Sequence, residues 1–321
     1  MKRAPKRDLA ASVKSRLLRL AKDRSEELQH VLVRYTIERL LYRLWCSPYA
    51  DTFILKGAIL ASAWEGGGYR PTKDLDLLGH GSKSPEAVAE VFRQIAGTEV
   101  EPDGLAFDPA TVAAEPILEE ARYGGVRVHL IARLGKARIP LQVDVGFGDP
   151  VTPGPVSLDF PSMLDLPSPS LRAYPAETIV AEKYETLVRL GVRTSRIKDF
   201  YDLWYLAMHF SFQGELLRRA IANTFRARGT SLPSKLPFAL TEEFGADRPK
   251  QALWKAFTKR SGITSPGDLA EALALLRTFL LPVGLENLLR LIVAWPPGGP
   301  WQEFPHPISG SSSEAGTASW T

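Results

Sequence analysis

Residues Thr72 to Leu78 alternate polar and apolar side chains, which is the pattern of a β-strand with one buried face. Alternate side chains of a strand point to the same face, so we expect Asp74 and Asp76 to lie side by side. Two neighbouring carboxylates repel each other unless a cation lies between them. Because hard oxygen ligands select Mg²⁺ or Mn²⁺, the pattern indicates a divalent-metal site.

A second alternating run, from Ile139 to Val145, carries Asp144 between two valines. We expect this run to be another strand, whose acid could join the same face as a third metal ligand. An Asp-x-Asp pair taken alone is more often an exposed strand edge or a turn. The case for a metal therefore depends on what surrounds the three acids.

The surroundings include a glycine turn that precedes the acidic strand. An apolar run from Thr52 to Leu55 leads into Lys56, Gly57 and Ala58, and a helix-compatible stretch follows to Trp64. Glycine at such a turn lets backbone N–H groups approach a triphosphate, and a helix N-terminus favours anions. The three turn residues are therefore candidates for nucleotide binding.

The periodicity changes along the chain. Helical spacing predicts two helices between Leu9 and Leu44 and a third from Pro85 to Ala96, and strand patterns occupy the region up to Val145. Seven prolines between Gly148 and Pro175 indicate a linker or an extended crossover. Helical patterns then dominate up to Leu285. We expect a domain over residues 1–160, a helical domain over 161–300 and a disordered tail over 301–321.

Composition is that of a soluble globular protein, with 45% apolar and 24% charged residues among 321. The single Cys46, expected to be buried, excludes an internal disulfide. The N-terminus has no signal-peptide pattern and we find no membrane-spanning stretch, so we expect a cytoplasmic protein without membrane contacts. Residues 1–45 hold twelve Lys or Arg against five Asp or Glu, which suits a polyanion such as RNA or DNA, or a solvated helical face.

The turn Leu55-Lys56-Gly57-Ala58, the block Arg70-x-Thr72-x-Asp74-x-Asp76 and the later Asp144 together resemble the signature of the DNA-polymerase-beta nucleotidyltransferase superfamily. The resemblance implies an α+β fold with a mixed sheet, in which the turn holds the phosphates of a nucleoside triphosphate. It also implies metal binding by the three aspartates and attack of a hydroxyl on the α-phosphorus, with the third aspartate taking the proton. Arg70 and Thr72 become further nucleotide-binding candidates. Ala58 departs from the usual glycine or serine, which puts the strength of the nucleotide contact at the turn in doubt.

Further blocks resemble the AbiEii nucleotidyltransferases, which are toxins of bacterial abortive-infection and type IV toxin–antitoxin pairs. The match spans roughly residues 10 to 285. The blocks are Tyr35-x-x-Glu38-Arg39, Phe53-x-Leu55-Lys56-Gly57, Glu177-x-x-x-Ala181-Glu182-Lys183, Arg196-x-Lys198-Asp199-Phe200-Tyr201-Asp202 and Trp254-x-x-Phe257. The family implies a helical C-terminal domain, with the active site in the cleft between the two domains.

By this resemblance Lys183 is an essential lysine that meets the triphosphate, and Asp199 is an essential acid. Glu182 and Asp202 are further candidates. From the helical pattern alone, Glu182, Lys183 and Glu185 fit the solvent side of an amphipathic helix equally well, and Asp199 and Asp202 fit helix capping or exposed pairing with Arg196 and Lys198.

The family also implies an RNA acceptor, in some members the 3′ end of tRNA, and a cognate antitoxin of the AbiEi type. Arg189, Arg193, Arg196 and Lys198 could hold an RNA backbone. Two alternatives stay open at this point. One is a nucleotidyltransferase that modifies a protein or a small molecule, and the other is a non-catalytic nucleic-acid-binding protein.

Overall fold

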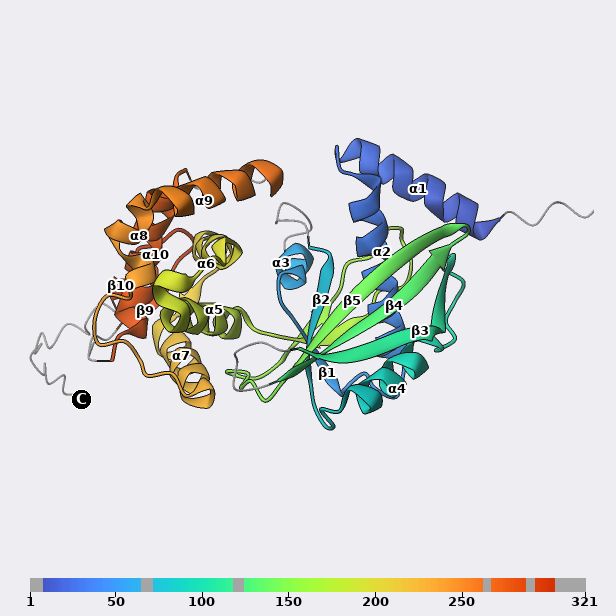
Figure 1. Cartoon of the computed structure of the whole chain (residues 1–321), viewed down its shortest axis with the longest axis horizontal. Helices are drawn as coiled ribbons and strands as arrows, with labels where there is room; N and C mark the ends of the chain where they lie inside the picture. The colour runs from blue at the N-terminus through green and yellow to red at the C-terminus, as the bar shows by residue number, and fades with distance from the viewer. Residues whose placement is uncertain (1–7, 65–71, 118–123, 262–266, 287–291, 304–321) are drawn as a thin grey trace, which may run out of the picture.

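The structure, a computed structural model, describes residues 8–64, 72–117, 124–261, 267–286 and 292–303. Its first half is built on a seven-stranded mixed sheet and its second half is mainly helical, as the sequence predicts (Figure 1). The strand order is β3-β4-β5-β2-β1-β7-β6. The strands are β1 (Phe53–Lys56), β2 (Asp74–Gly79), β3 (Leu105–Ile117), β4 (Gly125–Leu134), β5 (Ala137–Phe147), β6 (Val156–Asp159) and β7 (Ser170–Ala173).

The helices of the first half lie close to their predicted positions. They are α1 (Leu9–Asp23), α2 (Leu28–Cys46), α3 (Ile59–Trp64) and α4 (Pro85–Ala96). Helices α2 and α4 pack against the sheet and receive the apolar side chains that alternate along β4 and β5. Because apolar residues occupy that face, the polar side chains of the same strands are left for the opposite face. Asp144 lies on this opposite face.

Two parts of the sheet go beyond the sequence prediction. Strand β3 was not predicted, and the proline-rich segment contains β6 and β7 where a linker or crossover was expected. Strand β7 pairs in parallel with β1 through Leu55 and Ala173. The sheet therefore continues past residue 160, to the start of the helical half.

The helical half contains α5 (Ala176–Leu190), α6 (Ile197–His209), α7 (Gly214–Arg228), α8 (Glu242–Ala246), α9 (Arg248–Ser261) and α10 (Leu269–Gly284). A small antiparallel sheet of β8 (Phe212–Gln213), β9 (Ile292–Trp295) and β10 (Gln302–Glu303) adds to it. The prediction of helices did not include β8 and β9, and β10 falls at the start of the segment 301–321 that was expected to be a disordered tail, of which residues 304–321 lie outside the described residues. Cys46 is exposed at the end of α2, so the expectation that it is buried was wrong. No helix in the described ranges is long and apolar enough to cross a membrane.

Candidate active site

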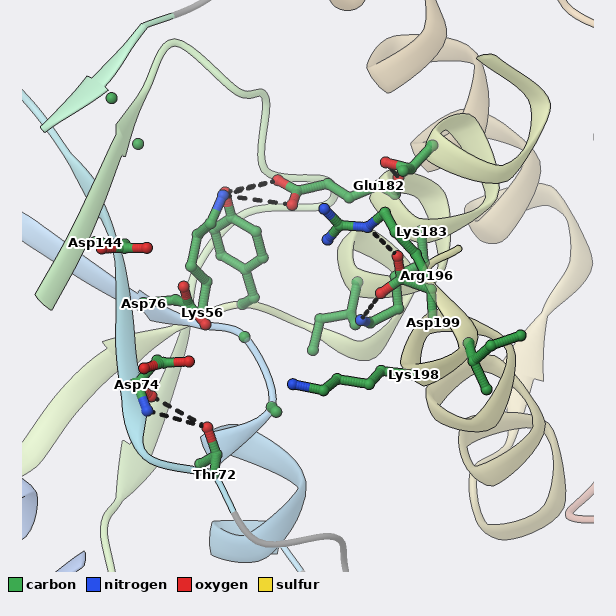
Figure 2. Close-up of a pocket in the computed structure, with 18 of the residues that line it drawn as sticks. Lys56, Thr72, Asp74, Asp76, Asp144, Glu182, Lys183, Arg196, Lys198 and Asp199 are labelled. Atoms are coloured by element: carbon green, nitrogen blue, oxygen red, sulfur yellow. Dashed lines mark hydrogen bonds and ion pairs between the residues drawn. The ribbon is translucent and has the colours of Figure 1, made fainter. Parts of the chain in front are cut away.

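A cavity of about 1120 Å³ lies between the open face of the sheet and the helical half. Pockets for small ligands usually measure ~300–1000 Å³, so this one can take a nucleotide together with part of a second substrate. The cavity is lined by Gly57 and Ala58 of the turn, by Asp74, Asp76 and Asp144, and by Lys183, Arg196, Lys198 and Asp199 from the helical half. The folded chain thus brings most of the predicted site residues to one space (Figure 2).

Strand β2 sets the positions of two of the acids. Asp74 is exposed and Asp76 is half-buried, while Leu75 and Leu77 between and beyond them point into the core. In the parallel pairing of β2 with β5, Asp76 lies directly beside Asp144. Burial, together with the charges of Asp144 and Asp74, raises the pKa of Asp76 to about 6 against the opposing effect of Lys56. A cation bound beside these carboxylates would therefore stabilise the charged form of Asp76.

Asp144 already has a cationic partner. Arg127 on β4 lies directly across from Asp144 and binds it with two hydrogen bonds, from Nε to Oδ1 at 2.8 Å and from Nη2 to Oδ2 at 2.7 Å. Bidentate pairs of this kind are among the stronger polar contacts in proteins. They also hold the carboxylate oriented toward Arg127.

The carboxylates fit a metal ion that shares its coordination with substrate. Among the described residues, no group of three or more His, Cys, Asp or Glu side chains is arranged to hold an ion. Asp74 and Asp76 nevertheless supply oxygen ligands on one strand face, and Mg²⁺ commonly binds through one or two carboxylates plus substrate phosphates. Ligation by all three aspartates stays a prediction, because Asp144 is engaged by Arg127.

Release of Asp144 should strengthen metal binding. We expect Arg127→Met to tighten Mn²⁺ binding about tenfold, or ~1.4 kcal/mol, because the change removes a competing cation and frees two oxygens. Titration followed by the electron paramagnetic resonance of free Mn²⁺ measures the dissociation constant. Arg133→Met on the same strand removes an exposed arginine and serves as the control. Unchanged or weaker Mn²⁺ binding in Arg127→Met would show that Asp144 is not a ligand.

The glycine turn lies against the acidic strand. Gly57 has a φ of 81°, a conformation that favours glycine, and a Cβ at this position would collide with the carboxylate of Asp76. Lys56 and Asp76 are cross-strand neighbours in the antiparallel pairing of β1 with β2. The backbone conformation and the closeness of Asp76 therefore both require glycine at position 57, where the turn meets the predicted metal site.

Lys56 does not offer a free ammonium to the cavity. Its Nζ lies 3.3 Å from Asp149 and 3.4 Å from Glu182 on α5. Burial lowers the pKa of Lys56, but the charges of Glu182 and Asp149 outweigh that effect and leave the pKa above its ordinary value. A direct contact of Lys56 with a triphosphate stays a prediction and would require it to exchange these partners.

Arg228, at the end of α7, extends this contact into a half-buried charge network, made up of Lys56, Asp149, Glu182, Glu185 and Arg228. Arg228 donates to Asp149 at 3.0 Å and to Glu185 at 2.9 Å. The side chain of Glu185 is fully buried. Glu182 and Glu185 are thus internal groups, and the alternative that they are solvent-side charges of an amphipathic helix is wrong.

Lys183 and the two acids of α6 form a second cluster. The Lys183 ammonium lies 2.8 Å from Asp199 and 2.7 Å from Asp202. Asp199 also binds Arg196 at 2.6 Å, and although burial raises the pKa of Asp199, Lys183 and Arg196 bring it below the ordinary value. The alternative of pairing with Arg196 thus holds for Asp199, but the pairing is not an exposed one on the side of the acids, since Asp199 and Asp202 are both buried.

The same cluster separates the two acids by position. Asp199 lines the cavity, whereas Asp202 has a fully buried side chain and is not among the lining residues. Asp199 can thus reach a substrate, and Asp202 acts on Lys183 from behind. Contact of Lys183 with a triphosphate stays a prediction, because its ammonium faces these two carboxylates.

The remaining candidates are placed as follows. Thr72 lines the cavity, and its hydroxyl donates to the Asp74 carbonyl at 3.2 Å, which ties it to the start of β2. Arg70 lies outside the described residues. Lys198 points from α6 toward the β2 side of the cavity (Figure 2). His30 also lines the cavity, although no sequence pattern marked it as a site residue.

Three charged residues of the site, Arg127, Asp149 and Arg228, were not among the residues predicted from the sequence. Arg127 belongs to an alternating strand, so its position on the polar face was readable, but its partner depends on the register of β4 with β5. Asp149 and Arg228 are 79 residues apart and meet only after folding. No local pattern marks either of them.

Comparisons with known proteins point to one family. A family model described as "Nucleotidyl transferase AbiEii toxin, Type IV TA system" matches residues 39–274. No curated protein matches the chain. The crystal structure of JHP933 from Helicobacter pylori is similar at 15% identity and a TM-score of 0.38, covering 71% of this chain and 95% of that one. A second Helicobacter pylori structure, described as a candidate nucleotidyltransferase, is similar at 16% identity and a TM-score of 0.37, covering 71% of this chain and 97% of that one.

The two structural similarities are too weak to support any detail of this chain. The family model, in contrast, covers most of it, from the middle of α2 to α10, and includes the turn, the three aspartates and both clusters of the helical half. The chain therefore belongs to the AbiEii family of nucleotidyltransferase toxins of type IV toxin–antitoxin systems.

Proposed function

We propose that this toxin transfers a nucleoside monophosphate from a nucleoside triphosphate to the 3′ end of an RNA, with tRNA as the first candidate, in the presence of Mg²⁺ or Mn²⁺. The observation that carries the proposal is the single cavity in which an acidic strand face, a glycine turn and basic side chains of the helical half meet. Membership in the family supports a nucleotidyltransferase with an antitoxin partner. It disfavours a non-catalytic nucleic-acid-binding protein.

In this proposal the acidic side holds the metal and positions the phosphates. Asp74 and Asp76 would hold the ion, which when bound would neutralise charge on the phosphate oxygens. Backbone N–H groups at Gly57 and Ala58 would bind the triphosphate, as the closeness of Gly57 to Asp76 allows. Asp144 would take the proton of the attacking hydroxyl after Arg127 yields its carboxylate, and pyrophosphate would leave.

The helical half would supply the positive charge that the phosphates need. The guanidinium of Arg196 is half exposed and the side chain of Lys198 is exposed, and both line the cavity. Lys183 would contribute its charge from behind them, held by Asp199 and Asp202. Positive charge from several positions around the leaving pyrophosphate lowers the barrier without covalent participation of the protein.

The test supplies the purified protein with Mg²⁺, total RNA and each α-labelled nucleoside triphosphate in turn. We expect label on the 3′ end of RNA with at least one nucleotide. Periodate oxidation of the RNA, which destroys the terminal diol, should prevent the labelling. Asp76→Ala should abolish it, and Asp51→Ala, at an exposed position outside the cavity, should not.

Parallel reactions without RNA decide the acceptor. Label on the protein itself, on an added protein or on an aminoglycoside, together with unlabelled RNA, would replace the RNA acceptor with that class. Transfer that survives Asp76→Ala would remove the metal site proposed here.

A further inference from the structure

Helix α9 carries an uneven charge. Its fourteen residues include five Lys or Arg and no Asp or Glu, whereas the whole chain has 40 basic against 36 acidic residues. The basic residues are Arg248, Lys250, Lys255, Lys259 and Arg260. Lys255 and Lys259 are four residues apart on the exposed side, where like charges destabilise a helix by a few tenths of a kcal/mol. A polyanion bound along this side would offset that cost.

The opposite side of α9 holds it firmly in place. Trp254 and Phe257 are buried, and the Trp254 indole donates to the Gly267 carbonyl at 3.1 Å. The Lys250 ammonium donates to the carbonyl of Thr194, just before α6. The helix therefore has a fixed orientation relative to the basic residues at the start of α6.

This orientation brings the C-terminal end of α9 to the cavity, where Arg260 is the one basic residue of the described helix that lines it. The C-terminal end of α9 points toward the sheet-bearing half (Figure 1), and Leu253, Phe257 and Arg260 line the cavity. Leu253 is 45% exposed, so an apolar surface lies at the cavity rim beside the basic row. An apolar side chain next to cations suits a nucleotide, which joins a flat base to a charged backbone.

We propose that the exposed side of α9, formed by Arg248, Lys255, Lys259 and Arg260, is the surface that docks the RNA backbone and guides the 3′ end past Leu253 into the cavity. The inference rests on the proposed function, in which RNA is the acceptor, and it locates the surface that binds this RNA. Arg248 and Arg260 are twelve residues apart, which at 1.5 Å per residue gives ~18 Å along the helix. That length serves several successive phosphates of a single strand.

An acidic protein, such as an antitoxin, is the competing occupant of a basic helix. RNA is favoured because the row ends in the cavity that holds the candidate catalytic residues, and an acceptor must deliver its terminal hydroxyl there. A protein that only inhibits the toxin has no such requirement.

The test compares Lys255→Gln/Lys259→Gln with Lys136→Gln/Arg138→Gln. The control pair removes the same charge from two exposed positions at the turn of the β4–β5 hairpin, and neither position lines the cavity. Glutamine keeps the helix propensity of lysine, so α9 should stay folded, and circular dichroism checks this. The α9 variant should raise the KM for RNA about tenfold, leave the KM for the nucleoside triphosphate unchanged, and reduce the slope of log K against log salt by ~1.4.

A trinucleotide acceptor provides an internal control, because it fills the cavity without reaching along α9. Its KM should be equal in the wild type and the α9 variant. Equal effects of the two variant pairs on long RNA, or an α9 effect confined to binding of an acidic protein partner, would overturn the inference. If the wild type labels no RNA at all, the proposed function itself fails, which is a distinct result.

Discussion

Replacing Asp76 with asparagine should abolish nucleotidyl transfer and yet make the metal-free protein more stable at neutral pH. Transfer should fall by about a thousandfold or more, because the variant lacks the carboxylate that binds the metal, and metal ions supply several kcal/mol to such reactions. The gain in stability follows from the pKa of Asp76, which burial and the neighbouring acids raise to about 6. The charged form is thus less favourable in the folded protein than in the unfolded chain.

The sign follows from the two pKa values. Well below pH 4 the Asp76 carboxyl is neutral in both states, so asparagine should change little. Between about pH 4 and 6 the unfolded chain releases the Asp76 proton while the folded protein keeps it, so the free energy of unfolding of the wild type falls relative to the variant and then stays lower above pH 6. The full shift corresponds to ~3 kcal/mol, and the partial exposure of Asp76 reduces our expectation to ~2 kcal/mol at pH 8.

Urea unfolding at pH 4, 6 and 8 with a metal chelator measures this difference. Asp51→Asn, at an exposed position, should show no pH-dependent difference from the wild type. Added Mg²⁺ should stabilise the wild type more than Asp76→Asn, because only the wild type keeps both carboxylates of β2. A variant that is less stable than the wild type at pH 8 would show that Asp76 is satisfied without a metal.

The largest loss of stability should come from Asp103→Ala, far from the chemistry. Asp103 is buried and binds two arginines of α2, with Arg43 Nη1 at 2.6 Å and Arg39 Nε at 3.1 Å. It also accepts a hydrogen bond from the Leu105 backbone at 3.0 Å. Removing the carboxylate leaves both guanidinium groups buried, and loss of one partner of a buried ion pair costs ~3–5 kcal/mol.

Thermal and urea unfolding of Asp103→Ala should therefore show a free energy of unfolding lower by ~3–5 kcal/mol, or an insoluble protein. Asp103→Asn keeps an acceptor for the backbone and should lose less. Asp51→Ala should change stability by no more than ~0.5 kcal/mol, as is usual at exposed positions. A loss below ~1 kcal/mol in Asp103→Ala would mean that Glu38, 3.6 Å from Arg39, compensates.

The contacts of Asp103 also explain one of the sequence blocks on which the resemblance to the family was based. In Tyr35-x-x-Glu38-Arg39, the Tyr35 hydroxyl donates to the Asp103 carbonyl, Arg39 binds the Asp103 side chain, and Glu38 accepts from the Met163 backbone at 2.9 Å. The block contributes to packing of α2 against two distant loops. The resemblance was informative, but its residues at this position are structural.

Local patterns predicted the elements whose periodicity is complete. Helix α4 and strands β2, β4 and β5 show it clearly, since one face of each packs into the core. Helix α2 is instead buried on nearly all sides between Val31 and Leu44. Strand β3 was missed because Pro109 and Pro116 lie inside it and its pairing with β4 shifts register between Asp108 and Ala113. Strands β6 and β7 have four residues each and are fixed by their partners, which a local pattern does not show.

At the site, sequence reasoning selected the acids and the glycine because strand alternation and turn chemistry are local. It did not show that Lys56, Lys183 and Asp144 each face a charged partner, since the partners come from other elements. The positions of the acids were therefore predicted correctly, whereas the ion pairs that these charged residues form were not. The difference matters here because partner exchange is part of how the site would bind substrate.

The half-buried charge network has a consequence for how this toxin can change through evolution. Lys56 and Asp149 come from the sheet-bearing half, and Glu182, Glu185 and Arg228 come from the helical half, with contacts that alternate across the boundary. A chimera that joins this sheet to the helices of a divergent homologue lacking these charges would leave half-buried ions at the boundary without their counterparts. Substitutions on one side of the boundary are therefore expected to require matching substitutions on the other.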